Sequence, residues 1–119
     1  MDKKSLGAKG ETIAVSLLRR QGYKILERNF HSRFGEIDIV AQDADTLVFV
    51  EVKTRWSKEF GLPEESVGAR KLKSIEKVGQ YFRLLHPEVP SSERIDVVAI
   101  ELDNSGKIIR RELIKNVSG

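Results

Sequence analysis

The chain has 119 residues and a formal net charge of +3, with an isoelectric point of about 9.3, which fits one domain with a mild basic bias compatible with nucleic acid. The absence of cysteine excludes disulfides, thiolate metal sites and cysteine nucleophiles. Residues 1–10 are too polar for a signal peptide and no apolar run reaches the ~20 residues of a membrane span, so we expect one cytoplasmic domain over residues 1–119 without a membrane partner.

The first predicted element is a helix over residues 6–21, which Gly22 ends. Its expected buried stripe consists of Ile13, Ala14, Leu17 and Leu18. Glu11 lies three residues before Ala14 and seven before Leu18, and therefore at the border of this stripe. Its carboxylate could reach across to the sheet. The alternative, which the position in the helix favours, is an acid stabilised near the helix N-terminus by the macrodipole.

Residues 23–30 predict the first strand, and residues 29–35 predict the turn that follows it. His31 in this turn could be a ligand or a general base, but a lone histidine beside a turn is more often solvated or packed. Arg33 is the better candidate there for contact with a phosphate.

Residues 35–53 predict a β-hairpin, because apolar and β-branched runs flank the polar residues 42–45. If its loop consists of Ala44 and Asp45, Asp38 falls directly opposite Glu51 and Lys53 shares their face. Opposed side chains on a strand pair are ~5 Å apart, so two carboxylates there repel unless they hold a hard divalent cation. The alternative is a surface Glu-Lys pair beside an unrelated Asp, which the apolar flanks disfavour. Glu36 shares the face of Asp38 and could bind the metal or cap the turn.

Residues 54–61 predict a polar loop in which Trp56 could stack on a base or, more commonly, pack beneath the loop. A second helix is expected to begin at Pro63 and to end at His86, before Pro87. Gly79 lies within its apolar stripe and indicates close backbone packing. The other face of this helix carries Arg70, Lys71, Lys73 and Lys77. It is either an ordinary solvated surface or a basic surface that helps to hold a polyanion.

Residues 95–100 and 107–113 predict two further strands, joined by a turn at residues 103–106. Asp96 inside the first of them is a second candidate acid, and Arg94 on the same face is its expected partner. The order helix, strand, hairpin, helix, hairpin predicts an α/β fold around a mixed five-stranded sheet.

These motifs together resemble the YraN-like family of uncharacterised bacterial proteins, over about residues 7–113. The residues that carry the resemblance are Gly10-Glu11, Gly35-Glu36-Ile37-Asp38, Glu51-Val52-Lys53, Arg55 and Ile95-Asp96-Val97-Val98-Ala99. That family is similar to the archaeal Holliday junction resolvases and to the PD-(D/E)XK nuclease superfamily. The resemblance implies a restriction-endonuclease-like three-layer sandwich, in which the mixed five-stranded sheet is flanked by helices. One departure is Ile37, which stands where the superfamily motif has proline.

The resemblance also implies a Mg²⁺- or Mn²⁺-dependent endonuclease for DNA, including branched or Holliday-junction-like DNA. The implied catalytic residues are Glu11, Asp38, Glu51 and Lys53. The implied metal ligands are Asp38, Glu51, the carbonyl of Val52 and, directly or through water, Glu11. The expected nucleic-acid contacts are Arg33, Arg55 and Lys71. A junction-cutting enzyme would form a homodimer; the alternative is a non-catalytic nucleic-acid-binding or scaffold module of the same fold.

Overall fold

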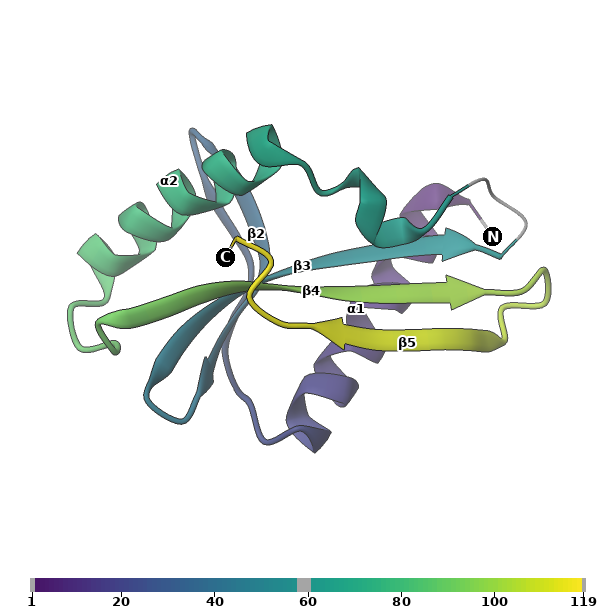
Figure 1. The fold of residues 1–119 in the computed structure, drawn as a ribbon, viewed down its shortest axis with the longest axis horizontal. Coiled ribbons are helices and arrows are strands. Elements are labelled where there is room, and N and C mark those ends of the chain that lie inside the picture. The colour runs from purple at the N-terminus through teal and green to yellow at the C-terminus, as the bar shows by residue number, and fades with distance from the viewer. Residues whose placement is uncertain (1, 58–60, 119) are drawn as a thin grey trace.

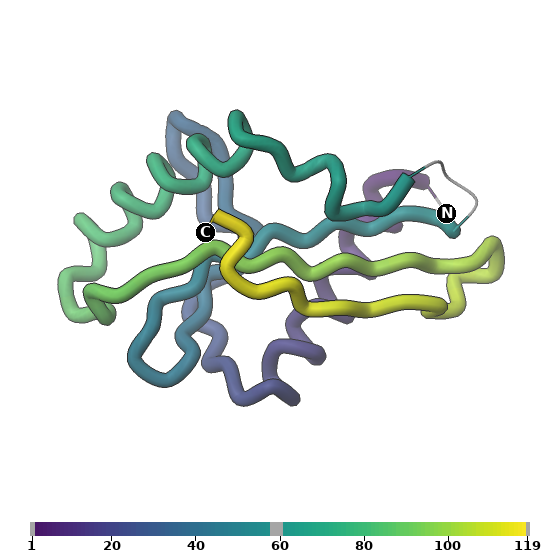
Figure 2. The backbone as a smooth tube through the Cα atoms, viewed as in Figure 1, coloured from purple at the N-terminus to yellow at the C-terminus, as the bar shows by residue number. Residues whose placement is uncertain are grey.

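The computed structural model describes residues 2–57 and 61–118. The elements follow in the order α1 (Lys3–Arg20), β1 (Lys24–Ser32), β2 (Gly35–Asp43), β3 (Thr46–Trp56), the short 3-10 helix η1 (Pro63–Ser66), α2 (Ala69–Leu85), β4 (Ser92–Leu102) and β5 (Ile108–Ile114). The strands form one sheet in the order β1-β2-β3-β4-β5 (Figure 1). Only β3 and β4 pair in parallel, because η1 and α2 cross between them, as the tube in Figure 2 shows.

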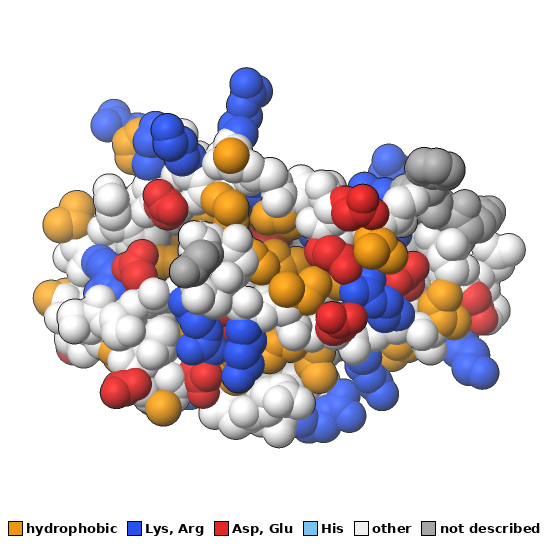
Figure 3. All heavy atoms as spheres, in the orientation of Figure 1, with side chains coloured by type: hydrophobic (Ala, Val, Ile, Leu, Met, Phe, Trp, Pro, Cys, Tyr) orange, Lys and Arg blue, Asp and Glu red, His pale blue; other side chains and the backbone are white. Residues whose placement is uncertain are grey.

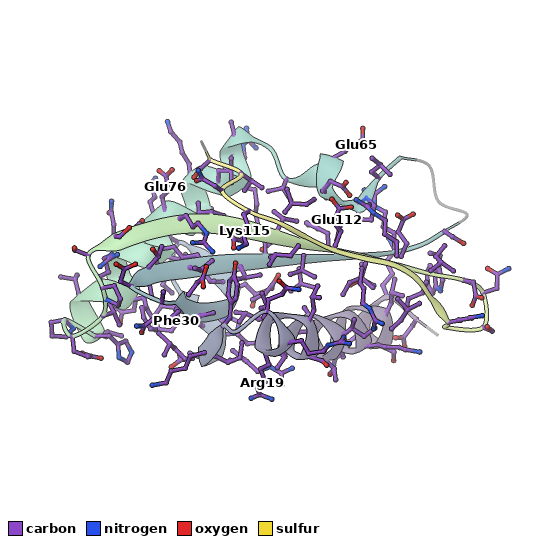
Figure 4. The ribbon with its side chains drawn as sticks, turned by 60° about the horizontal axis from the view of Figure 1, so that its bottom comes forward. Arg19, Phe30, Glu65, Glu76, Glu112 and Lys115 are labelled. Carbon is purple, nitrogen blue, oxygen red and sulfur yellow. The ribbon has the colours of Figure 1, made fainter. Side chains whose placement is uncertain are left out.

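The two helices cover opposite faces of this sheet. In Figure 4 the sheet lies between α2 above and α1 below, and the labelled Arg19 of α1 points away from the sheet. Leu18 of α1 packs in one buried cluster with Val50 of β3, while Phe82 of α2 packs in the other with Phe49, the preceding residue of the same strand. Adjacent residues of the strand therefore pack into the two cores on opposite faces of the sheet. The expected α/β three-layer sandwich with a mixed five-stranded sheet is confirmed.

The predicted register of the central hairpin is confirmed. Asp43 pairs with Thr46 and Ile39 with Val50, so the loop consists of Ala44 and Asp45 alone. Ala44 adopts a left-handed backbone with φ 54°, which tight hairpin loops require. In this register Asp38 and Glu51 are the next positions after the last pair, Ile39 with Val50.

The segment between β3 and β4 differs from the sequence prediction at both ends. The strand β3 continues through Trp56, whereas a loop was expected from residue 54; residues 58–60 of that loop lie outside the described residues. The expected single helix from Pro63 is divided into η1 and α2, because Val67 leaves the helical conformation and Gly68 is extended. Within the described residues, neither long helix has the length and apolar character needed to cross a lipid bilayer.

Gly79 packs its backbone against a core ring, as predicted. A Cβ at this position would lie 2.5 Å from the Phe49 ring, which is fully buried. We therefore expect Gly79→Ala to lower the free energy of unfolding by about 1–3 kcal/mol, measured by urea denaturation. Gly7 of α1 is the matched control, because a Cβ there meets nothing within 4 Å and Gly7→Ala should add about 0.5–1 kcal/mol. Equal effects of the two substitutions would contradict the close packing.

Candidate active site

The candidate site begins where β2 separates from β3. The last residue pair between these strands is Ile39 with Val50. Two residues beyond Val50, the backbone N–H of Val52 donates to Oδ2 of Asp38 at 2.8 Å. A carboxylate thus replaces the neighbouring strand as hydrogen-bond acceptor, which fixes Asp38 at the fork between the two strands.

The same point of the sheet is distorted on the side of β1. The pairs Arg28 with Ile39 and Phe30 with Ile37 leave Asn29 between them, with a left-handed φ of 53°. Asparagine tolerates this conformation better than most residues. The turn of the backbone directs the Asn29 amide to Glu11 of α1, to which its Nδ2 donates at 3.0 Å.

Asp38 and Glu51 form a close pair of carboxyl groups. Glu51 is only 4% exposed, and it lies close enough to Asp38 for its charge to act on that carboxyl group. Burial, followed by the charge of Glu51, raises the pKa of Asp38 to about 7, although the Val52 N–H opposes the shift. Two buried acids this close favour a shared proton or a bound cation over two free charges.

Two ammonium groups lie beside this carboxyl pair. Lys53 Nζ of β3 and Lys71 Nζ of α2 each lie 3.5 Å from Oε2 of Glu51. Lys53 was expected here from the alternation of the strand, whereas Lys71 was expected only as a nucleic-acid contact. Because α2 packs over the face of the sheet that carries Glu51, Lys71 reaches the pair from the other layer.

Glu11 is near the pair but is held by other residues. Its Oε1 accepts from Arg28 Nη2 at 3.0 Å and Nε at 3.1 Å, as well as from Asn29. Glu11 and Asp38 line one cleft of about 820 Å³. Nevertheless, no three His, Asp or Glu side chains of residues 2–57 and 61–118 are grouped to hold one ion. The structure therefore brings Asp38, Glu51 and Lys53 together, and leaves Glu11 with Arg28 on the wall of the cleft.

A close helix-to-strand contact positions Glu11 on this wall. Gly10 is buried, and a Cβ there would collide with the side chain of Thr54 in β3. The missing side chain lets α1 approach β3 beside Lys53. In the sequence, the signal for this close contact is the glycine directly before Glu11. The residue that Gly10 contacts, Thr54, lies 44 residues further along the chain, and only the tertiary structure identifies it.

The remaining candidates divide between this cleft and its surroundings. Arg55 and Glu36 line the cleft, and so do Lys3 and Lys4, which sequence analysis missed because the N-terminal residues carried no motif. The turn expected at residues 29–35 is shorter, because β1 continues through Ser32, so His31 lies in a strand; it is exposed and 3.4 Å from Glu36. Arg33 lies in the turn itself, over the Phe34 ring, and neither residue lines the cleft. Trp56 is partly buried and packs against the apolar cluster beneath α1, the alternative that the sequence favoured.

The donor chemistry of the pair fits a hard divalent cation. Asp38 and Glu51 supply adjacent carboxylate oxygens, which Mg²⁺ and Mn²⁺ prefer to nitrogen or sulfur. The hydrogen bond from Val52 to Asp38 holds the Val52 peptide next to the same pair. A bound cation would also reduce the repulsion between the two carboxylates, which protonation of Asp38 reduces in its absence. These are the residues that could hold a metal ion here.

Comparison with known proteins places the chain in a family. The uncharacterised protein family UPF0102 matches residues 10–100. A UPF0102 protein of Caldicellulosiruptor bescii is 46% identical over 117 residues, which cover 98% of each chain. A UPF0102 protein of Geobacter metallireducens is 46% identical over 116 residues, which cover 98% of this chain and 93% of that protein. A UPF0102 protein of Dictyoglomus thermophilum is 38% identical over 116 residues, which cover 98% of each chain. The chain therefore belongs to the uncharacterised protein family UPF0102.

Proposed function

We propose that this protein is a divalent-metal-dependent endonuclease that hydrolyses phosphodiester bonds of DNA. The observation that carries the proposal is the close pair of the half-buried Asp38 and the buried Glu51, with Lys53 3.5 Å from Glu51, at a cleft of about 820 Å³ that Asp38 lines. Two acids, a hydrophobic residue and a lysine in this arrangement also match the motif of the PD-(D/E)XK nucleases that the sequence resembles.

In this proposal Asp38, Glu51 and the carbonyl of Val52 hold Mg²⁺ or Mn²⁺, and Glu11 contributes from the wall of the cleft, directly or through water. The ion, when bound, polarises the scissile phosphate and lowers the pKa of water. Lys53 orients or deprotonates the attacking water and offsets the charge that develops on the phosphate oxygens.

Basic side chains around the cleft suit a polyanionic substrate. Arg55 lines the cleft and Lys71 of α2 lies 3.5 Å from Glu51, so both could contact phosphates. In this proposal the protein acts on DNA in the cytoplasm. If the DNA is branched, as in the resolvases that the sequence resembles, a twofold dimer would present two such sites to one junction.

The proposal is tested by incubating linear, nicked, flapped and four-way DNA with the purified protein and Mg²⁺ or Mn²⁺. Lys53→Ala is expected to reduce the cleavage rate at least ~100-fold, because it removes a charge that stabilises the transition state. Asp38→Ala should do the same through the loss of a metal ligand. Lys107→Ala, in the exposed β4–β5 turn, is the control and should cleave as the wild type does. Cleavage that persists in Lys53→Ala at the wild-type rate would refute the assignment.

A second candidate function is a non-catalytic nucleic-acid-binding module. It is favoured by the side chains that already pair with two of the acids in the absence of a metal. Two ammonium groups lie beside Glu51, and the Arg28 guanidinium lies beside Glu11. A protein that binds these DNA forms but cleaves none of them with either metal would support it. Metal-dependent cleavage that is lost in Lys53→Ala would exclude it.

A further inference from the structure

The turn between β1 and β2 presents an aromatic ring to solvent beside α2. Phe34 at this turn is 44% exposed, unlike Phe30, Phe49 and Phe82, which are buried in the core. The ring lines a second cleft, of about 510 Å³, with Lys77 and Tyr81 of α2. This cleft is distinct from the one that Asp38 and Glu11 line.

Hydrogen bonds on both sides hold the backbone of Phe34 in place. Ser74 Oγ of α2 donates to the Phe34 carbonyl at 2.8 Å, and the Phe34 N–H donates to Ser32 Oγ at 3.0 Å. Gly35 has a φ of 132°, and a Cβ there would lie 2.8 Å from Ser74 Oγ. The ring therefore projects from a turn that is fixed to α2, and its exposure is a property of the fold.

Two cations flank this ring. The guanidinium carbon of Arg33 lies 4.9 Å from the ring centroid, and Lys77 Nζ lies 5.9 Å from it. Interfaces between protein subunits are depleted in lysine, and an apolar partner would have to desolvate both charges. An aromatic face between two cations instead suits a ligand that has flat rings and negative charges.

The positive charge continues along α2 from this ring to the candidate active site. The helix contains Glu76 as its only acid and the bases Arg70, Lys71, Lys73, Lys77 and Arg83. Lys and Arg side chains stand out along the upper edge of the molecule, over α2 (Figure 3). Lys71 contacts Glu51, and Lys77 lies six residues further along the helix, about 9 Å at 1.5 Å per residue. This span corresponds to roughly two or three nucleotides of a strand.

We propose that Phe34 is a stacking site for an unpaired nucleobase of the nucleic acid that enters the Asp38–Glu51 site. The base stacks on the exposed ring in place of the Arg33 guanidinium, and Arg33 and Lys77 then contact the flanking phosphates. The proposal rests on the proposed function and narrows its substrate class to DNA with an unpaired nucleotide about two or three positions from the cleaved bond. Every base has a flat face, so the site requires an unpaired base without selecting its identity.

Binding without metal tests the proposal independently of cleavage. The probe is a DNA hairpin with one unpaired 2-aminopurine, compared with a fully paired duplex in EDTA by fluorescence anisotropy. Phe34→Ala is expected to bind the probe with the unpaired base about 5- to 100-fold more weakly and the duplex unchanged. The wild type should quench the 2-aminopurine, the alanine variant should not, and Phe34→Trp should restore both signals.

Leu85→Ala is the matched control. Like Phe34, Leu85 is an exposed apolar residue, at 52% exposure, but it lies at the end of α2 and outside the lining of this cleft. Wild-type affinity of Phe34→Ala for the probe would overturn the proposal. A wild-type dimer that Phe34→Ala dissociates in sedimentation would also overturn it, because the occupant would then be a second copy of the chain. If the base stacks on Phe34 but no DNA is cleaved, the proposed nuclease function is wrong and the base-stacking site is supported. If DNA is cleaved but Phe34→Ala binds the probe as the wild type does, the nuclease function is supported and the base-stacking site is wrong.

Discussion

Asp38→Asn is expected to be more stable than the wild-type chain at pH 8 in the absence of metal, by about 2–4 kcal/mol, and to lose metal-dependent cleavage. In the wild type, burial and the charge of Glu51 raise the pKa of Asp38 from 3.8 to about 7. One pKa unit corresponds to about 1.4 kcal/mol. The amide carries no charge, and its oxygen can still accept from the Val52 N–H. The substitution thus removes the repulsion between the two carboxylates.

The pH dependence of this effect has a definite sign. Between pH of about 4 and 7 the folded wild type binds more protons than the unfolded chain, because only the folded state has the raised pKa. Its free energy of unfolding therefore falls as the pH rises through this range. The advantage of Asp38→Asn should be small at pH 4 and largest above pH 7. Urea denaturation at pH 4, 6 and 8 measures it, with Asp45→Asn in the exposed loop of the same hairpin as the control.

Added metal should reverse the order of the two proteins. A cation that binds only the folded chain stabilises it by about 2.7 kcal/mol at a concentration one hundred times its dissociation constant. The wild type should gain this stability from Mg²⁺ or Mn²⁺, and Asp38→Asn should gain little, because it lacks one of the two acids. Equal stabilisation of both proteins, or a variant that is less stable than the wild type at pH 8 in EDTA, would contradict the paired-acid description.

Asp96→Ala is expected to lower the free energy of unfolding by about 3–5 kcal/mol, the effect of removing one partner from a buried charged network. Asp96 is completely buried in β4. Its Oδ1 accepts from Arg94 Nε and from the Asn116 N–H, both at 3.0 Å, and its Oδ2 accepts from the Tyr23 hydroxyl at 2.8 Å. Arg94 also contacts Asp43 at 2.7 Å. Alanine would leave these donors without their central acceptor.

The network joins segments that no local interaction brings together. It links the residue before β1, the end of β2, β4 and the residues after β5. Burial, followed by the hydrogen bond to Asp96, raises the pKa of Tyr23 to about 12, so the hydroxyl remains a donor over the whole accessible pH range. The expected partner Arg94 is confirmed, and Asp96 is accounted for as a structural acid.

Urea denaturation of Asp96→Ala and of Glu93→Ala distinguishes buried from exposed charge in the same strand. Glu93 pairs with Arg83 at 2.6 Å, but its side chain is 38% exposed, and its loss should cost less than about 1 kcal/mol. A cost below 1 kcal/mol for Asp96→Ala as well would show that the network contributes little to the fold.

The sequence by itself determined the features that depend on short-range geometry. A two-residue loop and the alternation of strand side chains sufficed to place Asp38 opposite Glu51 with Lys53 on the same face, because the register of a hairpin is set by its loop. The apolar spacing of the two long helices and the runs of the five strands likewise predicted the α/β sandwich. The start of α2 was misplaced because Pro63 favours any helical first turn, including the 3-10 turn that forms there.

Only the tertiary structure decided which side chains meet across layers. Glu11 stands at the border of its helix, as periodicity predicted, but the left-handed Asn29 and Arg28 of β1 determine where its carboxylate binds. Lys71 reaches Glu51 because α2 packs over that face of the sheet, and Tyr23 reaches Asp96 across 73 residues of sequence. Such contacts depend on the packing of elements that are distant in the chain, and no local pattern of residues specifies that packing.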